Sequence, residues 1–152
     1  MSAGSSCGTL ASAAVIVMSD TKAAELGITP LARIVSSGVT ALSPEIMGLG
    51  PVEASRQALG RAGMTIDDID LVEINEAFAA QVIPSYRDLG IDLDKLNVNG
   101  GAIAVGHPFG MTGARITSTI LNSLQFHDKT FGLETMCVGG GQGMAMIFER
   151  LS

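Results

Sequence analysis

A glycine-rich stretch constrains the fold of this chain more than any other feature: residues 99–115, with the sequence NGGAIAVGHPFGMTGAR. The stretch contains five glycines, one proline and one of the two histidines of the chain. Glycine tolerates positive φ and lets another group approach the backbone, whereas proline restricts itself and the residue before it. We therefore expect His107, which lies between Gly106 and Pro108, to be held in an extended conformation within a loop.

A helix is predicted directly after this loop. Apolar residues recur at helical spacing from Ala114 to Leu124. His107 is thus expected just before a helix N-terminus, whose positive end disfavours a protonated imidazole. A neutral imidazole in that place suits a hydrogen-bond donor to a developing oxyanion. The alternative is a structural histidine in a strand-to-helix loop, and the glycine content does not decide between the two interpretations.

The composition predicts one globular domain over residues 1–152. Hydrophobic residues make up 47% of the chain and charged residues 16%, which favours a sizeable core. The formal net charge is −6 without a basic cluster, so binding to nucleic acid is not expected. No apolar run approaches the ~20 residues of a membrane span, and Cys7 and Cys137 form no metal-binding pattern. We expect no membrane span, no metal site, and a cytoplasmic or organelle-matrix location.

Runs with strand and helix patterns alternate along the chain. Strands are expected at residues 13–18, 32–39, 71–74, 131–138 and 144–148. Helices are expected at residues 20–26, 52–62 and 76–89, and from the glycine-rich loop to about residue 126. This order predicts an α/β fold with α/β/α layers, in which a mixed five-stranded sheet carries helices on both faces.

Two further stretches place polar side chains where a strand ends. Asn75 follows the strand 71–74 directly, and ligands of open α/β sheets bind at the carboxyl ends of strands. Its amide either holds a water or substrate oxygen, or simply caps the next helix.

Cys137 ends another apolar strand and precedes the glycine-rich turn 139–143. Successive glycine amides can form an anion-binding nest, beside which a thiol can have a lowered pKa and act as nucleophile or as proton donor and acceptor. The alternative is a buried structural cysteine in front of a β-hairpin.

Together these stretches resemble the C-terminal domain of thiolases. The resemblance rests on NEAFA at residues 75–79, on the glycine-rich stretch 99–115 and on CVGGGQG at residues 137–143, in the family's order and spacing. The sequence MGLGP at residues 47–51 is also similar to a family loop. The resemblance covers nearly the whole chain. It implies a thiolase-like fold and an acyltransferase that cleaves 3-ketoacyl-CoA with CoA or condenses two acyl-CoA molecules.

The resemblance also implies a role for each matching residue. Cys137 matches the cysteine that acts as acid and base on the acetyl carbanion or the attacking thiol. His107 matches the histidine that donates to the thioester oxygen and helps to activate the nucleophile. Asn75 matches the asparagine that positions a water in the same oxyanion hole, and the amide of Gly139 matches a donor of a second one.

The chain departs from the family in what it lacks. The acylated cysteine of thiolases lies in an N-terminal domain that this sequence does not contain. Cys7 and Gly8 resemble the segment near the CoA pantetheine, so they are candidate CoA-binding residues and Cys7 is a poor nucleophile. Residues 10–12 are LAS where the family usually has Asn-Asp-Gly.

The resemblance implies CoA thioesters as substrates and no cofactor. The expected macromolecular partner is an N-terminal thiolase half or a second copy of this chain, in an oligomer. Without a nucleophile the chain alone is expected to be inactive. The alternative is a non-catalytic acyl-CoA-binding or assembly domain that kept the thiolase fold.

Overall fold

The computed structural model describes residues 12–152. In chain order, the elements are α1 (Asp20–Glu25), β1 (Ala32–Ala41), η1 (Pro44–Leu49), α2 (Gly50–Ala62), η2 (Ile66–Asp68), β2 (Leu71–Ile74), α3 (Ala79–Leu89), η3 (Leu93–Lys95), α4 (Ala102–Val105), α5 (Thr112–Phe126), β3 (Phe131–Val138) and β4 (Gln142–Arg150). The η elements are short 3₁₀ turns.

The strands form one mixed sheet in the order β1-β4-β3-β2. β2 pairs with β3 in parallel, whereas β3 with β4 and β4 with β1 pair antiparallel. The carboxyl ends of β1, β2 and β3 therefore meet at one edge of the sheet, together with the start of β4. The loops that follow these three strands leave from the same edge.

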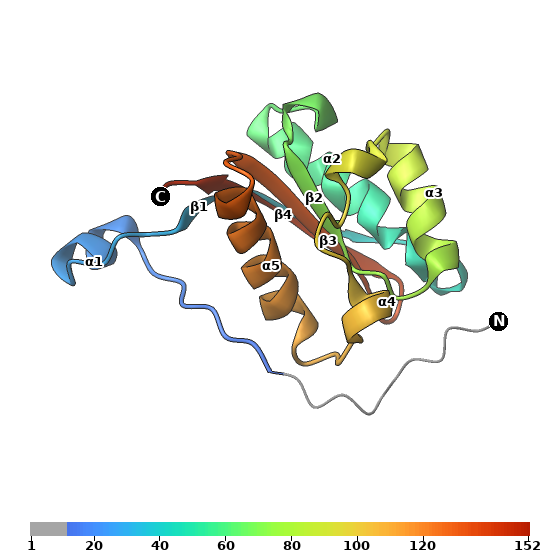
Figure 1. Ribbon diagram of the computed structural model, residues 1–152. Coiled ribbons are helices and arrows are strands. Elements are labelled where there is room, and N and C mark those ends of the chain that lie inside the picture. Colours follow the sequence, from blue (N-terminus) through green and yellow to red (C-terminus); the bar gives the residue numbers. More distant parts are fainter. Residues whose placement is uncertain (1–11) are drawn as a thin grey trace.

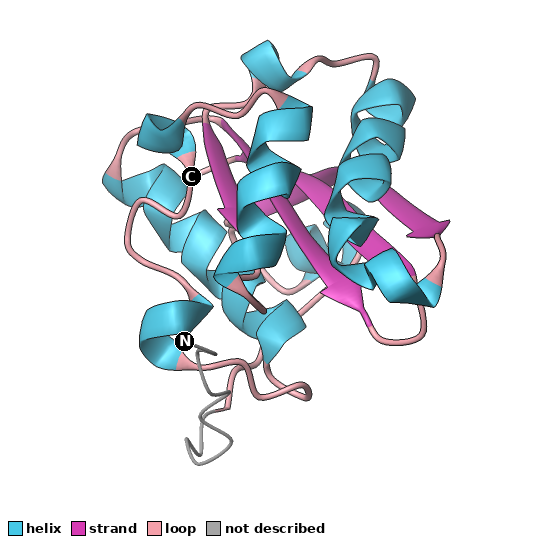
Figure 2. Cartoon of the chain, turned by 90° about the vertical axis from the view of Figure 1, so that its right-hand side faces the viewer, coloured by secondary structure: helices cyan, strands magenta, loops and turns pink. Residues whose placement is uncertain are grey.

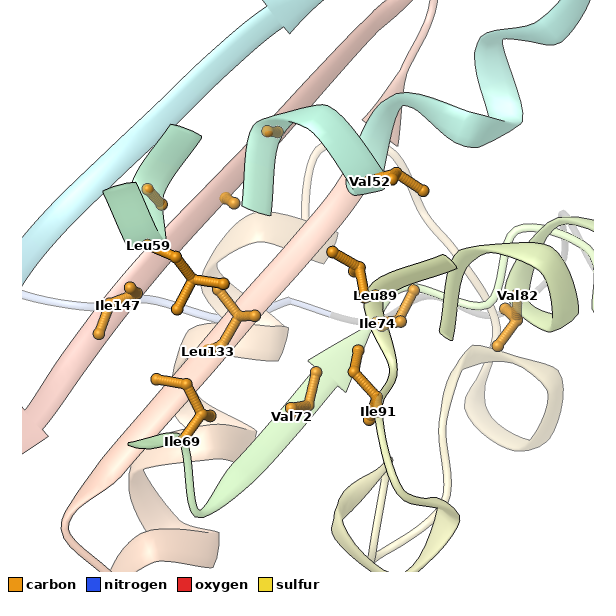
Figure 3. Close-up of a cluster of buried hydrophobic side chains, with 13 residues drawn as sticks. Val52, Leu59, Ile69, Val72, Ile74, Val82, Leu89, Ile91, Leu133 and Ile147 are labelled. Carbon is orange, nitrogen blue, oxygen red and sulfur yellow. The ribbon is translucent and has the colours of Figure 1, made fainter. Parts of the chain in front are cut away.

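Helices cover both faces of the sheet, as predicted (Figures 1 and 2). α2 and α3 lie on one face and α5 lies on the other. The larger apolar cluster fills the space between the sheet and the first pair of helices (Figure 3). A smaller cluster around Ile120, Leu124 and Phe148 lies under α5.

Strand β2 is buried along its whole length and serves both layers. Val72 and Ile74 belong to the larger cluster, and Leu71 belongs to the cluster under α5. Since side chains alternate between the faces of a strand, Glu73 and then Asn75 also point to the α5 side. The sequence of β2 thus places two polar residues between the sheet and α5.

Within residues 12–152 the sheet has four strands, so the prediction of a fifth strand at residues 13–18 is wrong. This apolar run is extended but pairs with no strand of the described chain, and Ile16 is 85% exposed. The run lies clear of the sheet in Figure 1. The free edge of β1 is met instead by α2, because Arg61 donates to the Ser37 carbonyl and Gln57 accepts from the Val39 amide.

The helix expected at residues 76–89 starts later than predicted. α3 begins at Ala79 with Phe78 as its N-cap, so Asn75 caps no helix. The side chain of Asn75 is completely buried and faces another segment of the chain. The predicted end of the helix 52–62 is confirmed, because α2 ends at Ala62 and Gly63 follows as its C-cap in the left-handed region at φ 66°. Within the described residues no helix is both long and apolar enough to cross a membrane.

Candidate active site

The polar residues predicted at strand ends lie on neighbouring strands. The main-chain N–H of Asn75 donates to the main-chain carbonyl of Thr135 in β3 at 2.9 Å, and this bond continues the parallel pairing of β2 and β3. Cys137 follows Thr135 by two residues on the same strand. The two residues thus occupy the carboxyl ends of adjacent strands, where the sequence predicted a site.

The end of β2 is fixed by an asparagine side chain in place of a further strand. The Ile74 N–H donates to Asn97 Oδ1 at 2.9 Å, and Asn97 Nδ2 donates to the Ile74 carbonyl at 3.0 Å. Asn97 also has φ 46°, a conformation that asparagine tolerates better than most residues. Its amide therefore satisfies the main chain directly before Asn75.

Glu76 connects this strand end to the glycine-rich segment. One carboxylate oxygen accepts from Asn97 Nδ2 at 3.0 Å, and the other accepts from the Ile103 amide in the first turn of α4 at 2.9 Å. A Cβ on Gly101 would collide with this carboxylate, so a larger residue there would force the Glu76 carboxylate to move out of these hydrogen bonds. Glu76 thus caps α4 and holds the segment that leads to His107.

His107 follows α4 after Gly106, which takes a positive φ of 89°. Its Nδ1 lies 2.6 Å from Thr112 Oγ1, and this hydroxyl donates to the Pro108 carbonyl at 3.1 Å. A hydroxyl that donates to the carbonyl is left to accept from Nδ1–H. This pattern assigns the Nδ1–H tautomer and leaves the Nε2 lone pair free for a proton.

Asn75 and His107 meet although 32 residues separate them. Asn75 Nδ2 lies 3.3 Å from Nδ1 and 3.2 Å from Nε2 of the imidazole. Because these distances are nearly equal, the amide packs against the ring and is not in line with either nitrogen. Asn75 Oδ1 is buried without a hydrogen-bond partner in residues 12–152. The side-chain amide of Asn75 therefore lies next to the imidazole and has an oxygen that is not hydrogen-bonded. This arrangement suits the binding of a small polar group, such as a water, beside His107.

The imidazole of His107 favours the neutral form, as predicted. Burial is the main cause that lowers its pKa, and the positive charge of Arg115 lowers it further. The expected location directly before a helix is only approximate, since α5 begins five residues later at Thr112. The direction of the prediction therefore holds, but burial and a neighbouring guanidinium are the causes.

The expectation of a lowered pKa for Cys137 is wrong. Its thiol is buried at the end of β3, and this burial raises the pKa. Cys137 pairs in register with Gly143 of β4, across the hairpin loop. Gly139 lies exposed at the start of this loop, and the Gly141 carbonyl accepts from the Leu42 amide at 2.8 Å. Because burial raises the pKa of Cys137, its thiol is protonated at neutral pH.

The site also has features that the sequence did not indicate. Asn97 stands in a stretch without a recognisable pattern, and Glu76 was expected in the first turn of a helix that begins later. The combination of Gly101 with a glutamate after a strand is a signal only once the fold brings the two together. Cys7 and Gly8, the predicted CoA-binding residues, lie outside the residues that the structure describes.

Comparison with known proteins places this chain in a family. The sequence profile of the family described as "Thiolase, C-terminal domain" matches residues 28–150. This match covers most of the chain, which therefore belongs to the thiolase family through its C-terminal domain.

Named relatives share more than half of the aligned residues. A 3-ketoacyl-CoA thiolase of Marinomonas sp. (strain MWYL1) is 57% identical over 141 residues, which are 91% of this chain and 36% of that protein. An acetyl-CoA acetyltransferase of Escherichia coli (strain K12) is 54% identical over 140 residues, 92% of this chain and 36% of the relative.

Solved structures match the fold as well. Human mitochondrial 3-ketoacyl-CoA thiolase in complex with CoA superposes with a TM-score of 0.85 at 45% identity, covering 88% of this chain and 34% of that one. The acetyl-CoA acetyltransferase of Bacillus anthracis superposes with a TM-score of 0.86 at 46% identity and the same coverage. The chain thus spans about a third of the length of the relatives that it matches.

Proposed function

We propose that this chain is the acid–base part of a thiolase-type acyltransferase, which cleaves 3-ketoacyl-CoA with CoA or condenses acyl-CoA molecules. The observation that carries the proposal is the contact of Asn75 with a neutral, anchored His107 at the end of β2. In this proposal residues 1–152 form one domain, and the chain acts in the cytoplasm or an organelle matrix.

His107 has two successive tasks in this mechanism. With Nδ1–H bound to Thr112, its Nε2 takes the proton of a nucleophilic thiol. The Nε2–H that results then donates to the thioester oxygen as negative charge develops there. Asn75 holds a water beside the same oxygen as a second donor.

Cys137 moves the other proton. A buried thiol with a raised pKa carries its proton at neutral pH. In the cleavage direction the acyl group passes to the nucleophilic thiol, the carbon–carbon bond breaks, and the departing acetyl-CoA carbanion takes the proton from Cys137 Sγ. The thiolate then takes the proton of incoming CoA, which attacks the acyl thioester. The Gly139 amide donates to the oxyanion of this second step.

The nucleophile has to come from another polypeptide or another part of the protein. Neighbouring segments of the site expose large apolar side chains: Phe109 is 87% exposed, and Phe78 and Ile103 are each more than half exposed. Apolar groups gathered beside a polar site favour a surface that a partner covers. The proposed partner is an N-terminal thiolase half or a second copy, with Cys7 and Gly8 near the CoA pantetheine.

The test is thiolysis of a 3-ketoacyl-CoA by the purified chain, alone and mixed with the N-terminal part of the Escherichia coli relative. We expect no turnover alone and turnover in the mixture. In the mixture, His107→Ala should lower the rate by ~10²–10³. The matched control is His127→Ala, at the exposed far end of α5, which should leave the rate unchanged. Turnover by the chain alone, or equal rates for the two variants, would contradict the proposal.

The burial of Cys137 favours one other function, a non-catalytic acyl-CoA-binding or assembly domain in which this thiol only packs. Calorimetric titration with CoA separates the two functions. Binding of CoA without turnover in the mixture, and unchanged binding by Cys137→Ala, would support the binding domain.

A further inference from the structure

Three charged side chains lie buried between the sheet and α5, beside the candidate site. Glu73 of β2 and Glu134 of β3 are register partners in the parallel pair, so their side chains stand next to each other. Arg115, in the first turn of α5, places Nη1 at 3.7 Å from Glu73 Oε2. Its side chain is 13% exposed and that of Glu73 is 2% exposed. We call these three residues the carboxylate–guanidinium cluster.

The charges of the cluster balance only when one proton is bound. Two ionised carboxylates and one guanidinium leave a net charge of −1, and an unpaired charge is costly to bury. Glu134 Oε1 accepts from Thr117 Oγ1 at 3.0 Å. Glu134 Oε2 has no hydrogen-bond partner in residues 12–152, and Arg115 Nε and Nη2 have none there either. One proton shared by the two glutamates makes the cluster neutral.

Burial acts in the same direction on both glutamates. It raises the pKa of Glu134 to about 8 and the pKa of Glu73 to about 7, although the Arg115 charge opposes both shifts. Glu76, which caps α4, adds to the rise for Glu73. Glu73 is the carboxylate paired with Arg115, whereas Glu134 has the higher pKa, so in the neutral cluster we assign the proton to Glu134.

The cluster is joined to the site on two sides. Glu73 precedes Asn75 by two residues and points to the same face of β2. Arg115 follows Thr112, which binds His107, by less than one turn of α5. We propose, building on the proposed function, that Arg115 is a positioning residue: its ion pair with Glu73 fixes the start of α5 against the end of β2, and its positive charge disfavours the protonated form of His107.

An NMR titration of the histidine ring Cε1–H signals tests this inference on the chain itself. The chain contains only His107 and His127. His127 follows the last residue of α5 and is the internal reference. Arg115→Met should shift the pKa of His107 upwards, because it removes the positive charge that lowers this pKa. Arg115→Lys keeps the charge and should retain most of the effect. An unchanged pKa of His107 in a folded Arg115→Met would overturn the inference.

A second variant keeps the inference testable should Arg115→Met not fold. Glu134→Gln imitates the protonated carboxyl and leaves Arg115 with Glu73. In the parent, ionisation of Glu134, whose pKa is raised to about 8, should move the His107 signal a second time near that pH, and Glu134→Gln should abolish this step. A parent signal without the step, or a step that persists in the variant, would refute the shared proton.

The titration needs neither substrate nor partner, so its outcome is separate from the proposed function. In the active mixture, Arg115→Met should lower kcat with little change in KM, and Arg115→Lys should restore part of it. A titration with the expected shifts but no turnover in any mixture would leave the cluster as inferred and remove the acyltransferase. Turnover in the mixture together with an unchanged His107 titration in Arg115→Met would support the acyltransferase and overturn the role inferred for Arg115.

Discussion

Asn97→Ala should destabilise the chain far more than a surface substitution. The variant leaves the N–H and C=O of Ile74 without the partners that Asn97 supplies at 2.9 and 3.0 Å. Ile74 is 1% exposed, so water does not replace these partners freely. Each buried group left unpaired costs ~1–3 kcal/mol. Alanine at φ 46° adds ~1 kcal/mol, which brings the expected loss of unfolding free energy to ~3–7 kcal/mol.

Urea unfolding followed by circular dichroism measures this loss. The matched control is Asn122→Ala, because Asn122 is exposed on α5 and, in the part of the chain that the structure describes, its side chain donates only to the Ser118 carbonyl of its own helix. The control should lie within ~0.5 kcal/mol of the parent. Asn97→Gly removes the same hydrogen bonds without the backbone strain, and thus separates the two contributions. If Asn97→Ala were as stable as Asn122→Ala, the Asn97 side chain would not be what fixes the end of β2.

Two further predictions concern α2 and the buried glutamates. Gly143→Ala should lower the unfolding free energy by ~1–3 kcal/mol or more, because its Cβ would collide with the Gly50 carbonyl. Gly60→Ala, in open space on α2, should instead raise it by ~0.5–1 kcal/mol. Equal unfolding midpoints for the two variants would contradict this prediction. The unfolding free energy should fall as pH rises from about 4.5 to about 8. The reason is that Glu134 has its ordinary pKa of about 4.5 in the unfolded chain and a pKa of about 8 in the folded chain, so over this range the folded chain holds a proton that the unfolded chain has lost. Glu134→Gln should flatten this fall, and an unchanged slope would refute the assignment.

The sequence predicted the layers and most elements because their signals are local. Four of the five predicted strands exist, and β3 has the predicted bounds of residues 131–138. The strand at residues 13–18 failed because an apolar run shows a tendency to be buried but does not supply the neighbour that a strand must pair with. The helix at residues 76–89 failed at its start because Asn75 and Glu76 have the chemistry of a helix N-terminus. In the structure they serve His107 and α4 instead.

Only those residues of the candidate site that stand out within a single loop could be predicted from the sequence. His107, Asn75 and Cys137 were identified from their places after strands and among glycines. The raised pKa of Cys137 and the cluster around Arg115 depend on which faces of two strands and a helix come together. No spacing in the sequence expresses that Glu73 and Glu134, 61 residues apart, stand side by side.

The segment VEINEAF shows why one short strand and the residues after it carry so much of this site. Alternation directs Val72 and Ile74 into the apolar cluster beneath α2 and α3, where they anchor the strand. The same alternation turns Glu73 towards Arg115 and Asn75 towards His107 on the other face. Once β2 ends, Glu76 is free to reach the first turn of α4. A shift of the β2 register by one residue would exchange the two faces, burying both glutamate and asparagine in the apolar cluster. The strand that anchors the core therefore also sets the geometry of the candidate site.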